Sequence, residues 1–176
     1  MLDEPIRLEA YRADWLATFE TERERIAEAL RVPPNSVEHI GSTAVVGLTA
    51  KPIVDIMIGS PGVPCPERWT AALANLGYEA MGEAGVPGRW YFRYRVPPFR
   101  NAHVVELHGL HWSNNLALRE YLRKSPDACR RYLEAKRQAV TMGATTLVAY
   151  SRAKRLMGET LLAEALSDTR NTENDS

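Results

Sequence analysis

The stretch "EHIGSTAVVGLTAKPIVDI", residues 38–56, decides the fold of this chain. Two apolar segments are joined through a Gly-Ser-Thr turn at 41–43, and the second segment carries one carboxylate, Asp55. The β-branched apolar run over 52–59, which ends in Gly-Ser-Pro, predicts a buried strand. An ionised carboxylate inside a buried strand is costly unless it is paired or binds a metal. Asp55 is therefore the first candidate functional residue.

The rest of the chain divides into a strand-rich part and a helical part. Apolar residues at helical spacing predict a helix over 8–31 that stops before two prolines. Strands are expected over 36–40, 78–81, 89–96 and 101–107, with a helix over 66–77 between them, and three helices over 112–125, 126–143 and 147–168. This order predicts an α+β domain, in which a small mixed sheet with flanking helices packs against a C-terminal helical layer.

The composition is that of a soluble globular protein. A length of 176 residues suits one domain, which we place at 1–168, followed by a disordered polar tail at 169–176. Lys+Arg and Asp+Glu balance at 22 each, so we expect no long nucleic acid as partner. No apolar run reaches the ~18 residues of a membrane span, and the N-terminus is charged. We therefore expect a cytoplasmic protein without membrane contact.

The Gly-Ser turn has two interpretations. If a helix starts here, its backbone N–H groups and its dipole suit a phosphate, which Gly41 and Ser42 would contact. Alternatively, Ser42 or Thr43 caps that helix and no ligand is needed.

Asp55 next to this turn favours the functional interpretation. An acid on a central strand beside a phosphate-binding turn is how phosphoryl-transfer enzymes hold Mg²⁺ against a nucleotide. The alternative is a salt bridge, with Lys51 or with an arginine of the strand over 89–96. Turn, acid and Lys51 together predict a ligand site.

Five further residues are candidates: three arginines, one histidine and one lysine. Arg89, Arg93 and Arg95 alternate along one strand and form either an anion clamp, with Arg89 foremost, or a charged edge. His103 is a candidate ligand or general base. Lys136 stands one turn from a tyrosine on a helix and reaches either a phosphate or the solvent.

The central stretch resembles the signature of the GrpB-like family, a branch of the nucleotidyltransferase superfamily of the DNA polymerase beta type. The resemblance extends to "RLEAYRADWLATFETERERI", to "GEAGVPGRWYFRYR" and to "HVVE" with the helices after it, and so covers roughly residues 6–165. It implies a nucleotidyltransferase-like fold. Similar domains are joined in some proteins to a dephospho-coenzyme A kinase domain, which implies a role near nucleotide or coenzyme metabolism.

In the superfamily, a Gly-Ser contacts nucleotide phosphates, two acids two residues apart bind metals, and a third acid comes from a later strand. By position, Gly41 and Ser42 match the first element and Asp55 matches the first acid. The second acid is replaced by Met57, which cannot bind Mg²⁺, and this replacement is general in the family. The later strand offers His103 or Glu106, and strand alternation allows at most one of them to face Asp55.

Two functions follow from this pattern. The first is a Mg²⁺-dependent transferase for ATP or another NTP, with Asp55 as metal ligand and a small molecule or protein as acceptor. His103 or Glu106 completes its catalytic set, and Gly41-Ser42-Thr43, Lys51, Arg89 and Lys136 bind phosphate. The second is a non-catalytic module that keeps the fold and binds a nucleotide or anion, for which Met57 is the main argument.

Overall fold

The structure, a computed structural model, describes residues 7–62, 65–143, 146, 150 and 155–174. Five strands form one mixed sheet in the order β1-β2-β5-β4-β3, with β2 and β5 parallel and the other neighbours antiparallel. The strands are β1 (Val37–Ile40), β2 (Ile53–Ser60), β3 (Glu79–Ala80), β4 (Trp90–Tyr94) and β5 (Phe99–Glu106). The predicted mixed α+β architecture is confirmed.

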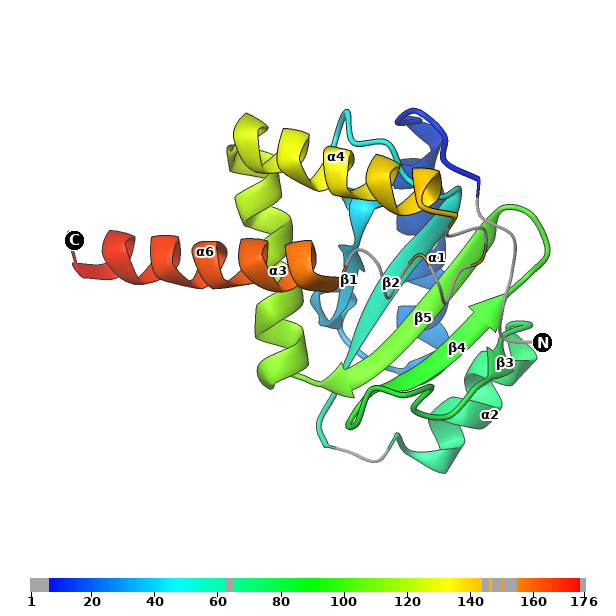
Figure 1. Cartoon of the computed structure of the whole chain (residues 1–176). Coiled ribbons are helices and arrows are strands. Elements are labelled where there is room, and N and C mark those ends of the chain that lie inside the picture. The colour runs from blue at the N-terminus through cyan, green and yellow to red at the C-terminus, as the bar shows by residue number, and fades with distance from the viewer. Residues whose placement is uncertain (1–6, 63–64, 144–145, 147–149, 151–154, 175–176) are drawn as a thin grey trace.

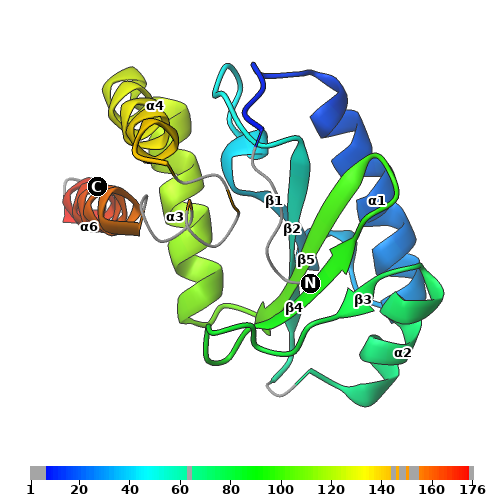
Figure 2. The same ribbon diagram turned by 45° about the vertical axis from the view of Figure 1, so that its right-hand side comes forward.

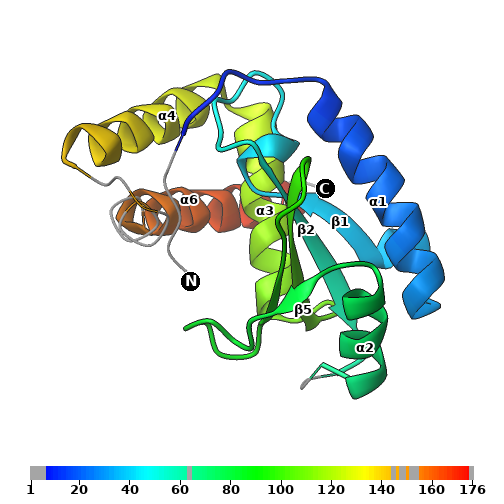
Figure 3. The ribbon, with the colours of Figure 1, turned by 90° about the vertical axis from the view of Figure 1, so that its right-hand side faces the viewer.

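Helices cover the two faces of the sheet unequally. The α-helices are α1 (Asp14–Leu30), α2 (Glu67–Asn75), α3 (Leu110–Lys124), α4 (Pro126–Thr141) and α6 (Arg155–Asn174), with 3₁₀ helices η1 (Pro34–Ser36) and η2 (Ser42–Ala44). Figures 2 and 3 show α1 and α2 on one side of the sheet and α3, α4 and α6 on the other. In Figure 1, α6 extends past α3 and away from the sheet. Among the described residues, no helix is both long and apolar enough to cross a bilayer.

Strand alternation separates two apolar clusters. Val54, Ile56 and Ile58 of β2 face α1 and α2, where they pack in the largest cluster with Phe19 and Trp69. The opposite face of the sheet contributes a smaller cluster, in which Met57 lies with Ile40, Val105 and Trp112. The polar residues of interest lie on this second face.

The cluster under α1 also contains a charged group that the sequence did not reveal. Glu22 is 1% exposed, and its carboxylate accepts from the hydroxyl of Tyr78 at 3.1 Å and lies 3.5 Å from Nε of Arg100. The guanidinium of Arg100 also lies 3.9 Å from the ring centroid of Tyr94. Burial, followed by the charge of Glu22, raises the pKa of Tyr78. The buried ion pair between Glu22 and Arg100 therefore links α1 to β5 inside the core.

Two element boundaries differ from the sequence prediction by more than two residues. The first helix begins at Asp14 rather than at residue 8, because the backbone of Glu9 pairs with that of Ala50 at 2.8 and 3.0 Å. The last helix, α6, continues to Asn174 and so includes most of the tail that we expected to be disordered. The predicted helix start at 147 lies outside the described residues.

Candidate functional site

The register of the sheet brings the candidate residues into two neighbouring rows. Asn101 of β5 stands opposite Asp55 of β2 and opposite Arg93 of β4. In the next row on the same face, His103 stands opposite Met57 and Tyr91. Asp55 and His103, which lie 48 positions apart in the chain, therefore come together as the alternation argument allowed.

Asp55 is the centre of a connected set of hydrogen bonds. Its Oδ1 accepts from Nδ2 of Asn101 at 2.7 Å and contacts Nε2 of His103 at 3.3 Å. Oδ1 of Asn101 accepts in turn from the hydroxyl of Tyr91 at 2.9 Å and from Nη2 of Arg95 at 3.0 Å. We call these five residues the Asp55 cluster.

The cluster keeps the Asp55 carboxylate ionised. Burial acts to raise its pKa, but the hydrogen bond and charge of His103, the charge of Lys51 and the Asn101 amide outweigh burial and lower the pKa well below its usual value. About a quarter of the carboxylate side chain remains exposed. A negative charge is thus fixed on the sheet face and still reachable from solvent.

Positive groups border this charge. The charges of Lys51 and Arg89 each act on Asp55, and Arg95 reaches it through Asn101. Nη2 of Arg89 also donates to the carbonyls of Glu83 and Ala84, at 3.1 and 3.2 Å, in the glycine-rich loop. Burial lowers the pKa of Arg89 from its usual value. One carboxylate is therefore surrounded by several cations.

The three arginines predicted to form a row have different partners. Arg93 is buried, and its Nη2 lies 2.7 Å from Oε2 of Glu79 on β3. Arg95 folds onto Asn101 and the carbonyl of Arg100, at 3.0 Å each. Of the three, Arg89 acts on Asp55 through its charge and Arg95 reaches it through Asn101.

The Gly-Ser turn does not start an α-helix. Gly41 has a φ of 71°, and the turn continues into η2, a 3₁₀ helix of three residues. A β-carbon on Gly41 would lie 2.8 Å from Oδ2 of Asp55, so the glycine permits the turn to pack directly on the carboxylate. The expected helix dipole for a phosphate is therefore missing, while the turn does lie next to Asp55.

Both hydroxyl groups of the turn have partners inside the protein. Oγ of Ser42 lies 2.7 Å from Nζ of Lys136. Oγ1 of Thr43 lies 2.9 Å from Nε2 of His39, whose ring stacks on Phe19 with centroids 4.7 Å apart. Thr43 is buried, so it serves the packing of the turn rather than contact with a ligand.

Two arginines of α3, which were not among the predicted site residues, hold the segment around the turn. Arg119 donates to Glu38 at 2.6 Å and to the carbonyl of His39 at 2.8 Å. Arg123 donates to the carbonyl of Ala44 through Nε and Nη2, at 3.1 and 2.9 Å. Arginines among acids at helical spacing are typical of a solvated helix face, and only the fold brings the turn against these two.

The donors at this site do not fit two magnesium ions. Mg²⁺ prefers oxygen ligands in octahedral geometry, and Met57, where the second acid is expected, is fully buried among apolar residues. Glu106 stands opposite Ser60, at the far end of β2 from Asp55. The described residues contain no group of three or more His, Cys, Asp or Glu side chains suited to a metal. His103 is the only one of the two candidate partners that reaches Asp55.

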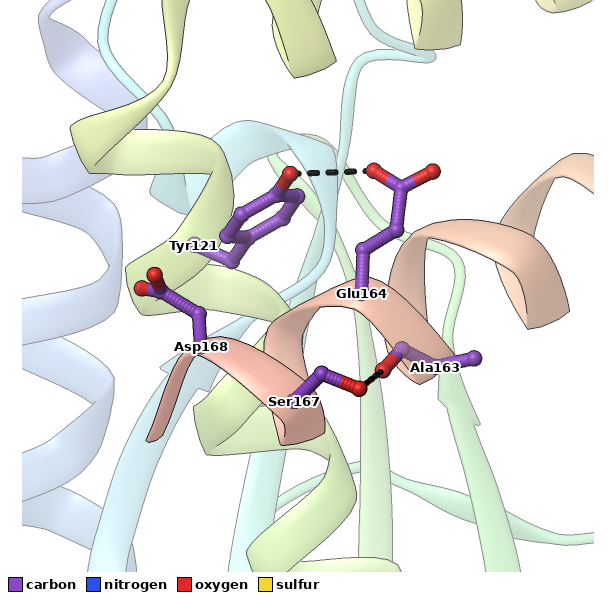
Figure 4. A pocket seen from close by; sticks show the side chains of 5 residues that line it. All are labelled: Tyr121, Ala163, Glu164, Ser167 and Asp168. Carbon is purple, nitrogen blue, oxygen red and sulfur yellow. Dashed lines mark hydrogen bonds between the residues drawn. The ribbon is translucent and has the colours of Figure 1, made fainter. Parts of the chain in front are cut away.

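A surface pocket of 420 Å³ lies elsewhere, between α3 and α6 (Figure 4). It is lined by Tyr121, Ala163, Glu164, Ser167 and Asp168, and the hydroxyl of Tyr121 donates to Glu164 at 2.9 Å. Because it is open and separate from the Asp55 cluster, it adds nothing to the chemistry of that cluster.

Comparison with known proteins identifies the family. The sequence profile of the family described as "GrpB protein" matches residues 5–164. A UPF0157 protein of Pseudomonas aeruginosa is 38% identical over 169 residues, which cover 93% of this chain and 70% of the relative. The UPF0157 protein YqkA of Bacillus subtilis is 27% identical over 145 residues, 82% of this chain and 42% of the relative.

A solved structure agrees with these sequence matches. The crystal structure of conserved protein GrpB from Enterococcus faecalis superposes with a TM-score of 0.77 at 29% identity, over 93% of this chain and 99% of that one. The family profile, the relatives and the shared fold all cover most of the sequence. The chain belongs to the GrpB family.

Proposed function

We propose that the protein binds a nucleotide, ATP in the first instance, or a similar phosphorylated small molecule at the Asp55 cluster, as a binding module rather than as a two-metal transferase. The observation that carries this proposal is the contrast between two neighbours on β2. Met57 is fully buried in an apolar cluster, whereas Asp55 is ionised, partly exposed and bordered by cations.

The charges around Asp55 support an anionic ligand. Guanidinium groups match phosphate oxygens in pairs, and Arg89 and Arg95 both lie at the cluster. Lys51 adds a third cation. The balanced charge of the whole chain favours a small ligand over a long nucleic acid. A turn packed on the acid of the next strand also supports our proposal that the fold is related to the nucleotidyltransferase superfamily.

A Mg²⁺-dependent transferase is the second candidate, and the ionised carboxylate beside the turn favours it. In that case Asp55 would hold the metal of a Mg²⁺–nucleotide, and a small molecule or a protein would be the acceptor. Asp55 would have to serve without a second carboxylate beside it, because neither Met57 nor Glu106 supplies one.

Calorimetric titration with ATP, with and without Mg²⁺, tests both candidates. A binding module binds ATP in both conditions, and Asp55→Asn keeps or tightens the affinity because it removes a negative charge. Arg89→Met weakens binding about tenfold, since a charge-assisted contact is lost, while Arg12→Met, an exposed arginine of another ion pair, serves as control. Binding that requires Mg²⁺ and disappears in Asp55→Asn supports the transferase, and no binding rejects both.

A further inference from the structure

Lys136 of α4 is a buried cation in contact with the Gly-Ser turn. Its side chain is 1% exposed, and its Nζ lies 2.7 Å from Oγ of Ser42 and 2.7 Å from the carbonyl oxygen of Thr49. The ring centroid of Tyr132, one helical turn earlier, lies 4.6 Å from Nζ. These positions place the ammonium inside the protein, where it cannot touch a ligand in the way the sequence suggested.

The polarity of the contact with Ser42 follows from the chemistry of the two groups. A lysine ammonium has three donors and no acceptor, so Ser42 Oγ must accept. The hydroxyl hydrogen of Ser42 is then directed to a different acceptor. Ser42 is half-buried and follows Gly41, which packs on the Asp55 carboxylate. Ser42 is thus a partly exposed residue next to the one that packs on the Asp55 carboxylate.

We infer that Lys136 is a positioning residue, which acts through Ser42 by fixing that hydroxyl as a hydrogen-bond donor to a phosphate oxygen of the ligand. The inference rests on the proposed function and adds to it the residue that makes the Ser42 hydroxyl a hydrogen-bond donor toward the ligand. Without Lys136, the Ser42 hydroxyl is free to donate to a protein carbonyl, so its direction toward the ligand is lost.

The neighbouring contacts confine this role to the turn. Arg119 and Arg123 of α3 already hold the backbone at His39 and Ala44. The Lys136 ammonium adds the contacts to the Ser42 side chain and to Thr49. Removing Lys136 therefore leaves the backbone braced at His39 and Ala44, and it changes the Ser42 hydroxyl and the contact with the Thr49 carbonyl.

A double-mutant cycle tests the inference through ATP affinity. Lys136→Met and Ser42→Ala are each expected to weaken ATP binding about tenfold. The double variant should bind ATP no more weakly than the weaker-binding single variant, because both substitutions remove the same contact. Lys136→Arg keeps most of the affinity. Arg130→Met, an exposed position on the same helix, changes it less than about twofold. Losses that multiply to about a hundredfold would overturn the inference, because Lys136 would then act independently of Ser42.

Thermal denaturation of the same four proteins separates this inference from the proposed function. If the wild type binds no ATP, the proposed function fails. The coupling between Lys136 and Ser42 is then measured through the Tm alone. Lys136→Met is expected to lower the Tm by about 5 °C in the wild-type background and by clearly less in Ser42→Ala. An equal loss in both backgrounds shows that Lys136 does not act through Ser42 and rejects the inference.

Discussion

Nδ2 of Asn101 lies 2.7 Å from Oδ1 of Asp55, directly across the parallel pair of β2 and β5. Tyr91 and Arg95 both donate to the other end of the same amide, so its NH₂ group has to face the carboxylate. The position of Asp55 is consequently set by the sheet, which is more rigid than a loop. Because this carboxylate is held in place, an added side-chain atom on the turn beside it should destabilise the protein.

Gly41→Ala is expected to destabilise the protein by about 2 kcal/mol more than Gly47→Ala. Both glycines have positive φ, 71° and 81°, but a β-carbon on Gly41 would lie 2.8 Å from Oδ2 of Asp55, whereas Gly47 has nothing within 4 Å. Urea denaturation of the two variants isolates the contact with Asp55 from the backbone strain. Equal losses would show that the turn does not press on the carboxylate.

Restoring the expected second acid is expected to fail. Met57→Asp places a carboxylate in a fully buried apolar cluster and should cost about 3 kcal/mol or more, whereas Met57→Leu should cost under about 1.5 kcal/mol. Chemical denaturation with and without Mg²⁺ measures both costs. A stable Met57→Asp protein that Mg²⁺ stabilises further would instead reveal a working metal site.

Protein stability is expected to fall as the pH drops below neutrality because of His39. Burial, the largest effect, lowers the pKa of His39 from 6.5 to about 4. In the unfolded chain this histidine takes up a proton near pH 6.5, so the unfolded state gains protons first and the native state loses stability between pH 6.5 and 4. The shift corresponds to about 3 kcal/mol at the acidic end.

Denaturation curves from pH 4 to 7.5 measure this loss. His39→Gln removes the titrating ring and keeps an amide that can reach Thr43, so its stability should be flatter over the same range. Asp55, whose pKa is lowered, keeps its stabilising effect until the pH falls below about 4, its ordinary value, and does not disturb the measurement. A slope that is identical in both proteins would assign the pH dependence to other groups.

The buried pair under α1 gives the largest expected effect. Glu22→Ala leaves Arg100 buried without its carboxylate and should cost about 3–5 kcal/mol, while Glu22→Gln should cost less because it keeps an acceptor for Tyr78. Glu28→Ala on the exposed side of the same helix is the control. Guanidinium denaturation measures the free energy of unfolding of each variant. A loss below about 1 kcal/mol in Glu22→Ala would mean that the ion pair is dispensable.

The sequence predicted the sheet and Asp55 for physical reasons that are local. A β-branched run bounded by turn residues has few alternatives to a buried strand. The alternation of side chains along a strand likewise predicted that only one of His103 and Glu106 could face Asp55. Asn101 was not predicted, because its amide does not titrate. Its position two residues before His103 put it on the same face, and an amide in a buried strand was the available signal.

Contacts between distant segments were beyond the same reasoning. Lys136 shares the buried face of α4 with Ala128, Tyr132 and Ala139, but a lysine at such a position commonly extends its ammonium to solvent. The contact of that ammonium with Ser42 depends on where α4 crosses the turn, which helical periodicity does not show. The arginines of α3 were not predicted for the same reason, because their acceptors are backbone carbonyls in β1 and η2.

The hold of α3 and α4 on the turn bears on how the chain reaches its fold. The contacts made by Arg119, Arg123 and Lys136 join residues 79 to 94 positions apart, so each one closes a long loop whose entropy cost precedes its stabilisation. During synthesis, the Gly-Ser turn is made long before the helices that brace it. The Gly-Ser turn therefore acquires its final shape only after α4, which is synthesised later, has docked.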